Sequence, residues 1–271
     1  MAEISAKQVQ ALRSKTDLPM MDCKNALVEA KGDEAQALEL LRKRFADKMT
    51  TRAEKEAANG RIGVFADGNA AAMAELRCET DFVATNDKFT ELANVVARQA
   101  AATGVTDVEQ LKATKLPDGR TVNDLLVDAF GKLRENMYIH RATRLTGPGA
   151  GYVHHNGRVA TIVVCDKEPG EPGRHVCMHV ASTPVILGLV REDVAPALVQ
   201  EAKERAAAEA AGKPPPIIDK IVTGKMNKWY QERVLTEQAF VMDDKKSVGT
   251  YAQENGFVVK AFLKFEVGGL K

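Results

Sequence analysis

The chain has 271 residues, and its 38 Lys and Arg against 37 Asp and Glu give a formal net charge of +1 at pH 7. This balance, without a long basic run, argues against non-specific nucleic-acid binding. The sequence contains neither a signal peptide nor an apolar run long enough to cross a bilayer, so we expect a soluble cytoplasmic protein with no membrane partner. Its four scattered cysteines are expected to be reduced.

The first 45 residues predict a compact three-helix unit. Ser5 and Gln8 have capping-box spacing, Pro19 suits the start of a second helix, and Asp33 can cap a third. The charged segment 46–58 then indicates a solvated helix or linker. The expected apolar stripes of the three helices are Val9 and Leu12; Met20, Cys23, Leu27 and Ala30; and Ala37, Leu38, Leu41 and Phe45.

A phenylalanine stands among small and polar residues in the run from Thr80 to Ala84. It follows a strand-like segment, residues 72–79, in which small or apolar residues alternate with mostly larger or charged ones. Large apolar side chains on polar loops are usually either buried locally or used on a partner. The residues alone leave both interpretations of Phe82 open, and they also allow Asp81 to be a helix N-cap.

An internal repeat indicates two related α+β subdomains. Residues 63–69 and 151–157 align without gaps, and both contain Asp-Gly or Asn-Gly hairpin signals ahead of a strand. Helical patterns follow each hairpin, at 88–102 and 175–182. Two units are too few for a solenoid, so we expect a pseudo-symmetric core with antiparallel sheets.

The rest of the chain is assigned from periodicity and turn residues. An amphipathic helix is expected at 121–133, with Thr121 and Asp124 at capping-box spacing. A strand at 137–145 entering the second subdomain and a Pro/Gly-rich surface loop at 168–173 are expected next. A helical hairpin is expected over residues 193–235 and a final strand over 257–267. The predicted fold is therefore α+β, with these domains: a three-helix domain 1–45, a linker 46–58, and core subdomains 59–147 and 148–271, the latter including the hairpin.

The sequence resembles the bacterial elongation factor Ts family from residue 4 to about residue 269. The two most specific motifs are the run beginning at Met20 and the run beginning at Thr80. The matching residues are Leu12 to Thr16, Met20 to Leu27, Gly32-Asp33, Leu41-Arg42, Thr80 to Ala84 with Asn86 and Phe89, Gly131 to Arg141, Phe240 to Met242, and Phe262 to Gly268.

The resemblance implies a guanine-nucleotide exchange factor that promotes GDP release from elongation factor Tu during translation. Phe82 would enter the GTPase near its magnesium ion, with Asp81 beside it, and no cofactor or metal of the chain's own is expected. The candidate contacts are Thr80, Asp81, Phe82 and Val83 for magnesium-ion dislocation, and Met20, Met21, Lys24, His154, Val241 and Met242 for other parts of the partner.

The same resemblance limits what can be expected. Many relatives continue into a further C-terminal helix beyond the position of Lys271, so one anchoring contact is expected to be missing. Some relatives self-associate, but the Pro-rich tip of the predicted hairpin leaves a homodimer open. The three-helix unit is also similar to ubiquitin-associated domains, which suggests a peptide-binding adaptor as an alternative function.

The histidines are the residues that best fit a catalytic metal site. His175 and His179 lie four apart on a predicted helix with Cys177 between them, and His154 and His155 lie on a hairpin. No Glu completes an H-E-x-x-H pattern, and no nucleophile-elbow or phosphate-loop motif is present. We therefore do not expect the chain to be an enzyme, and we expect that mutating His175 and His179 together does not affect nucleotide exchange.

Overall fold

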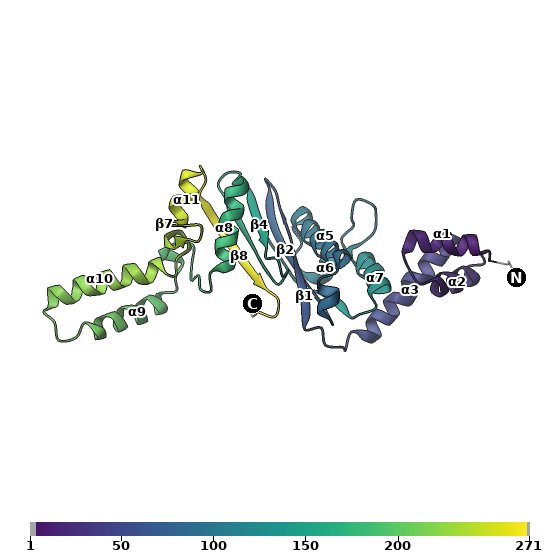
Figure 1. Ribbon diagram of the computed structural model, residues 1–271, viewed down its shortest axis with the longest axis horizontal. Coiled ribbons are helices and arrows are strands. Elements are labelled where there is room, and N and C mark those ends of the chain that lie inside the picture. The colour runs from purple at the N-terminus through teal and green to yellow at the C-terminus, as the bar shows by residue number, and fades with distance from the viewer. Residues whose placement is uncertain (1–3, 270–271) are drawn as a thin grey trace.

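The computed structural model describes residues 4–269 and extends along one long axis (Figure 1). At one end lie three helices, α1 (Ala6–Thr16), α2 (Met20–Glu29) and α3 (Glu34–Arg52). Two sheets with their helices form the middle, and the hairpin of α9 (Pro196–Glu209) and α10 (Pro215–Gln231) projects from the other end. Helices and antiparallel sheets are both present, as the predicted α+β class requires.

The remaining elements lie between these two ends or follow the hairpin. The helices are α4 (Asp81–Ala84), α5 (Asp87–Thr103), α6 (Val108–Ala113), α7 (Val122–Leu133), α8 (Gly170–Ser182) and α11 (Val248–Glu254), with short 3-10 turns at Arg191–Asp193 and Leu235–Glu237. The strands are β1 (Asn59–Ala66), β2 (Ala70–Cys78), β3 (Met137–Thr146), β4 (Gly149–Val153), β5 (Val159–Cys165), β6 (Ala239–Phe240), β7 (Asp243–Ser247) and β8 (Val259–Glu266).

The two larger sheets are antiparallel and pack face to face. Their strand orders are β1-β2-β3 and β4-β5-β8, and a shared cluster that includes Ile62, Met73 and Ile162 fills the space between them. Both predicted hairpins, β1–β2 and β4–β5, are confirmed. Residues 137–145, expected as a strand leading into the second subdomain, form β3, which pairs with β2 in the first sheet.

Strand β2 is buried on both faces, which its alternating pattern did not predict. Alternate residues from Ala70 to Cys78 pack with α5, whereas Ala71 and Met73 pack with the second sheet. Glu75 is fully buried, and Arg141 Nε lies 2.7 Å from its Oε2. Helix α5 also packs very closely on β1, since a Cβ at Gly63 would lie 2.1 Å from the backbone of Ala93.

The three N-terminal helices share a hydrophobic cluster with α7. Phe45 and Leu18 pack with Val127 and Phe130, and a Cβ at Gly131 would lie 2.8 Å from the Phe45 ring. The unit is therefore attached to the core by packing as well as through the chain. The segment expected to be a solvated helix or linker from residue 46 is helical as far as the end of α3.

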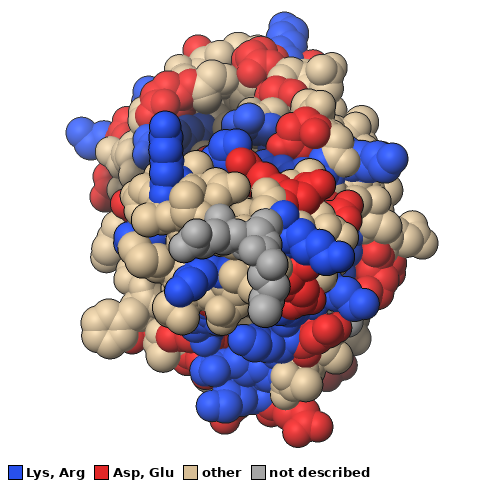
Figure 2. All heavy atoms as spheres, turned by 90° about the vertical axis from the view of Figure 1, so that its right-hand side faces the viewer, with Lys and Arg blue, Asp and Glu red and all other residues tan. Residues whose placement is uncertain are grey.

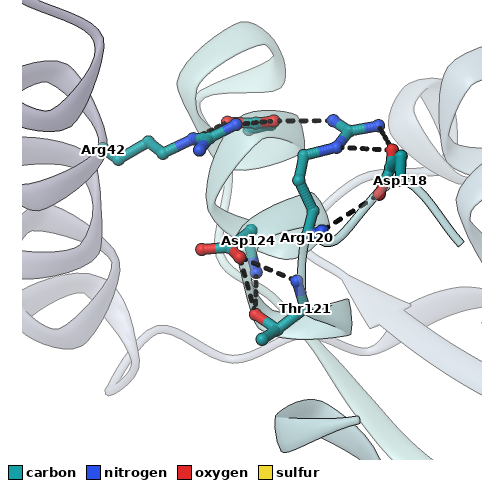
Figure 3. A network of polar contacts seen from close by, with 6 residues as sticks. Arg42, Asp118, Arg120, Thr121 and Asp124 are labelled. Carbon is teal, nitrogen blue, oxygen red and sulfur yellow. Dashed lines mark hydrogen bonds and ion pairs between the residues drawn. The ribbon is translucent and has the colours of Figure 1, made fainter. Parts of the chain in front are cut away.

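Polar contacts reinforce that junction at its rim (Figure 3). Arg42 of α3 reaches Asp128 of α7 at 3.3 Å, and Arg120 contacts the same carboxylate at 3.2 Å. Thr121 and Asp124 form the capping box that the sequence predicted for α7. These pairs are partly exposed, so each adds little stability and the apolar contacts dominate.

Two local predictions are wrong. Met20 was placed on the buried stripe of α2 but is 50% exposed, because it is the first helical residue and its side chain projects past the end of the three-helix core. Ala26 is buried there with Cys23 and Leu27. Residues 168–173 are not wholly a loop, since α8 begins at Gly170 and Pro172 lies in its first turn, where a missing N–H costs no helical bond.

Candidate functional site

Phe82 is displayed on the single-turn helix α4. Its side chain is 84% exposed, whereas Val83 and Ala84 next to it are 6% and 8% exposed and pack into the core beneath. The interpretation in which Phe82 is tucked under its own loop is therefore wrong. Val83, a candidate contact to the partner, is buried and anchors the helix from below.

Thr80 holds the start of this helix in place. Its hydroxyl oxygen accepts a hydrogen bond from the Val83 amide at 3.4 Å. In the other direction its amide and hydroxyl donate to the two carboxylate oxygens of Glu135, at 3.0 and 2.7 Å. The N-cap is thus Thr80 and not Asp81, which lies exposed in the first turn.

Glu79 fixes the strand end from which α4 departs. Arg52 Nη2 donates to Glu79 Oε2 at 2.9 Å, and the Asn136 amide donates to Glu79 Oε1 at 2.6 Å. The hydrogen bond from Arg52 is the main reason that the pKa of Glu79 is lowered to about 2. The carboxylate therefore stays charged and ties the end of α3 to the end of β2.

Two ion pairs join the N-terminal helices to this region. Lys88, in the first turn of α5, pairs with Asp17 just after α1, and Arg134, just after α7, pairs with Asp22 of α2. Lys88 lies shortly after α4 in the chain, and Arg134 directly precedes Glu135, which binds Thr80 at the start of α4. The two ion pairs therefore place the start of α2 at the same end of the core as α4. The exposed candidates there are Met20, Met21 and Lys24.

Arg61 connects α4 with the β4–β5 turn that carries His154. Its Nη1 donates to the Ala84 carbonyl at 3.4 Å, and the same guanidinium packs against Gly157, where an added Cβ would lie 2.7 Å from it. His154 is half-buried, and its Nδ1 lies 3.0 Å from the Tyr152 hydroxyl. The structure thus brings His154 into the neighbourhood of the Phe82 helix.

Val241 and Met242 lie elsewhere, in the turn between β6 and β7. They are 55% and 49% exposed, so both present apolar surface. The turn is next to α8 and α11, on the side of the second sheet away from β1 and β2 (Figure 1). The candidate contacts therefore form two separate regions, one around α4 and the start of α2, the other at this turn.

The surface at the N-terminal end does not carry a field of one sign. Figure 2 shows Lys and Arg side chains interspersed with Asp and Glu over this face. No helix among residues 4–269 is long and apolar enough to span a membrane. The exposed apolar side chains are thus the most distinctive features of the candidate site.

Comparison with known proteins gives one consistent result. A family model described as Elongation factor TS matches residues 79–269. Proteins named Elongation factor Ts from Psychrobacter sp. and Burkholderia thailandensis are 38% and 39% identical, each over 99% of this chain and 92% of the relative. A third, from Kineococcus radiotolerans, is 38% identical over 99% of this chain and 100% of the relative.

This chain belongs to the elongation factor Ts family.

The histidines considered for an enzyme have other contacts in this member of the family. His175 Nδ1 lies 2.9 Å from the Tyr251 hydroxyl, and His179 Nε2 lies 3.0 Å from Gln238 Oε1. Cys177 is buried, and burial raises the pKa of its thiol to about 12. Within residues 4–269 no group of three or more His, Cys, Asp and Glu side chains is arranged to hold a metal ion.

Three supporting residues of the site were not identified from the sequence. Glu135 lies inside a segment that matched the elongation factor Ts family, but nothing local indicated that it reaches Thr80, which is 55 positions away. Arg61 sits in a strand and resembles an ordinary surface cation. His179, whose Nδ1 accepts a hydrogen bond from the Val241 amide at 3.2 Å, was considered only as a metal ligand. A long-range contact was needed to identify each of them.

Proposed function

We propose that this chain is a guanine-nucleotide exchange factor that promotes release of GDP from elongation factor Tu during translation elongation. Membership of the elongation factor Ts family supports this role, and so does the name that its relatives carry. The reaction needs no covalent chemistry from the chain. It requires a surface that binds the nucleotide-free GTPase better than the GDP-bound form.

The mechanism is a thermodynamic coupling. If binding of the partner lowers the affinity of the GTPase for GDP by some factor, bound GDP must lower the affinity of the GTPase for the partner by the same factor. In the GTPase, GDP is held through its phosphates and a magnesium ion, which demands nearly ideal octahedral geometry. A small displacement of the ligands of that ion therefore loses much of the GDP affinity.

Phe82 is the group that we assign to this displacement. It would enter an apolar crevice near the magnesium site, and burial of its side chain contributes roughly 1.5–3 kcal/mol, gained only in the distorted state. Asp81, exposed beside it, would place a negative charge near the ligands of the ion. Thr80 and Val83 would act indirectly, by holding the helix.

The other contacts would provide affinity. Residues 1–45 are proposed to grip the GTPase domain through Met20, Met21 and Lys24. Within the two proposed core subdomains, 59–147 presents Phe82, while 148–271 contributes His154 toward the third domain of the GTPase and the Val241–Met242 turn. Exposure of Met21 and of that turn supports these assignments, since both present large apolar side chains to solvent.

The observation that carries the proposal is an 84% exposed phenylalanine on a helix anchored from below. The test follows release of a fluorescent GDP analogue from elongation factor Tu at fixed magnesium, with no addition, with the parent chain and with Phe82→Ala. We expect the variant to lose about 10- to 100-fold in exchange efficiency, which corresponds to roughly 1.5–3 kcal/mol.

Circular dichroism of the same variant is the control. Because Phe82 is exposed, its unfolding midpoint should match that of the parent. An unfolded variant would show that the side chain is structural. Failure of the parent chain itself to accelerate GDP release would refute exchange activity and favour the peptide-binding adaptor.

A further inference from the structure

His179 of α8 is buried and uses both ring nitrogens. It is only 4% exposed. Its Nε2 lies 3.0 Å from Gln238 Oε1, and its Nδ1 accepts a hydrogen bond from the Val241 amide at 3.2 Å. The ring also lies against Phe240, with centroids 6.0 Å apart. One side chain of α8 thus contacts both the residues before β6 and the turn that follows it.

The hydrogen bonds determine which nitrogen of His179 carries the proton. The side-chain amide nitrogen of Gln238 donates to the carbonyls of Val185 and Glu232, at 3.1 and 2.9 Å, so the orientation of this amide is fixed and its oxygen faces His179 as an acceptor. The Thr183 hydroxyl, whose oxygen lies 3.3 Å from Nε2, donates its own proton to the His179 carbonyl at 2.8 Å. Both neighbours of Nε2 are therefore acceptors, and Nε2 carries the proton. Nδ1 is left with its lone pair, as the Val241 N–H requires.

The turn that His179 contacts lacks the residues typical of a two-residue hairpin connection. Phe240 pairs with Asp243, so Val241 and Met242 form a two-residue hairpin connection. Such connections favour Gly, Asn or Asp with positive φ, because that twist matches the strands. Neither Val241 nor Met242 has a positive φ, and both are apolar and exposed. The turn therefore departs from the usual type of two-residue hairpin connection, and its negative φ values are those that Val and Met favour.

We propose that His179, as its neutral Nε2–H tautomer, is a positioning residue that holds the Val241–Met242 turn in the shape that contacts the GTPase. This role rests on the proposed exchange function. It revises the expectation that His179 has no effect on exchange. Gln238 extends the support, because its contact with the Glu232 carbonyl just after α10 links the turn to the base of the helical hairpin.

Protonation of His179 would oppose this arrangement. A proton on Nδ1 would face the Val241 N–H, placing two donors against each other. Burial lowers the pKa of His179 from its ordinary value of 6.5, so the ring stays neutral at neutral pH. The unfolded chain takes up this proton near pH 6.5 and the folded chain does so only at lower pH, so this contribution to stability is complete above that value and declines below it.

The charged and titratable groups around α8 are arranged differently. His175 contacts Tyr251 of α11 and lies 3.6 Å from Glu171 of its own helix. Lys264 of β8 donates to the carbonyls of Ala181 and Thr183, both at 3.0 Å, at the end of the helix. These groups have their own partners, so a change in the Val241 hydrogen bond can be traced to His179.

Replacing His179 by Asn or Gln separates its two hydrogen bonds. The oxygen of His179→Asn can occupy the position of Nδ1 and accept from Val241, whereas the amide nitrogen of His179→Gln can occupy the position of Nε2 and donate to Gln238. His179→Phe removes both contacts. His175→Gln, on the same helix, is the matched control because its ring does not contact the turn.

The first readout is hydrogen exchange at the Val241 amide in the free chain. Protection should persist in His179→Asn and His175→Gln, and be lost in His179→Gln and His179→Phe. In the parent it should also fall at acidic pH before neighbouring amides are affected. Equal protection in the Asn and Gln variants would overturn the positioning role, whether or not the chain binds elongation factor Tu.

The second readout is affinity for nucleotide-free elongation factor Tu. We expect His179→Gln to weaken it roughly 3- to 10-fold, about the worth of one hydrogen bond, and His179→Asn to restore most of the loss. Loss of amide protection without any loss of affinity would overturn the link between the turn and the partner. A parent chain that does not bind would instead refute the proposed function, and the amide data would still decide the hydrogen bond.

Discussion

The Phe82 helix and the Val241–Met242 turn present apolar side chains in two different ways. Helix α4 is anchored by its own neighbours, with Val83 and Ala84 in the core and Thr80 as the cap. The β6–β7 turn follows the buried Phe240, but the amide of Val241 depends on a histidine 62 positions earlier in the chain. Phe82 is held by residues of its own short helix, whereas the Val241–Met242 turn is held by His179 of α8.

This difference predicts separate roles, nucleotide displacement for α4 and affinity for the turn. A side chain that must displace tightly held ligands needs a rigid support. If α4 moved when Phe82 is inserted, the binding energy would shift the helix and not the ligands of the magnesium ion. A side chain that only adds affinity can sit on a turn whose shape is set by one contact. Perturbing each support should therefore produce different losses.

The largest expected effect on stability comes from the cap of α4. Thr80→Val removes the hydroxyl that accepts from Val83 and donates to Glu135, and should cost about 1–2 kcal/mol of unfolding free energy, with a fall in exchange. Urea unfolding and GDP release measure the two losses. Thr85→Val is the control, since the Thr85 hydroxyl, at the other end of the helix, only donates to the carbonyls of Asp81 and Phe82. Equal losses in both variants would contradict the assigned role of Thr80.

The next effect is a pH dependence at Glu79. Its folded pKa is lowered from 4.5 to about 2, chiefly by Arg52. Its contribution to stability is therefore present above pH 4.5 and is lost as the pH falls toward 2. Glu79→Gln should be less stable than the parent at pH 6, and the gap in urea midpoint should shrink across this window. A gap that stays constant would contradict the assignment.

A smaller effect is expected at the β6–β7 turn. The double variant Val241→Ala, Met242→Ala should keep its unfolding free energy within about 0.5 kcal/mol, since both side chains are exposed. Its affinity for nucleotide-free elongation factor Tu should fall about tenfold, as expected for loss of roughly 1–2 kcal/mol of apolar contact. Val258→Ala, at another exposed valine, should leave binding unchanged. Unaltered affinity of the double variant would remove the turn from the interface.

The smallest effect is expected at α2. Met21→Ala should weaken binding by about threefold or less, because most contacts outside the centre of an interface contribute under 1 kcal/mol. The rate of GDP release at saturating concentrations of the chain should not change. Titration of the release rate measures both quantities. A lower saturating rate would mean that α2 takes part in nucleotide displacement.

Local patterns in the sequence were sufficient for much of the fold. The capping boxes at Ser5 and Thr121 and the Asp-Gly and Asn-Gly turns are confirmed, because these contacts join neighbouring residues. Periodicity was less reliable at helix ends. It placed Met20 in the core, although this first residue of α2 is 50% exposed.

Long-range contacts were not predictable in the same way. The burial of Glu75 follows from two sheets packing face to face, which an alternating pattern in a single strand does not reveal. The exposure of Phe82 could be stated only as one of two alternatives. The partners of Thr80 and Val241, namely Glu135 and His179, depend on tertiary structure and carry no local sequence signal.

The most direct test of the central claim is the rate of GDP release at saturating concentrations of each variant. Phe82→Ala should have a much lower saturating rate, whereas the double variant of Val241 and Met242 should reach the parent rate at a higher concentration. This result would assign displacement to α4 and affinity to the turn. If Phe82→Ala reached the parent rate once enough was added, Phe82 would contribute only to affinity and the account would be contradicted.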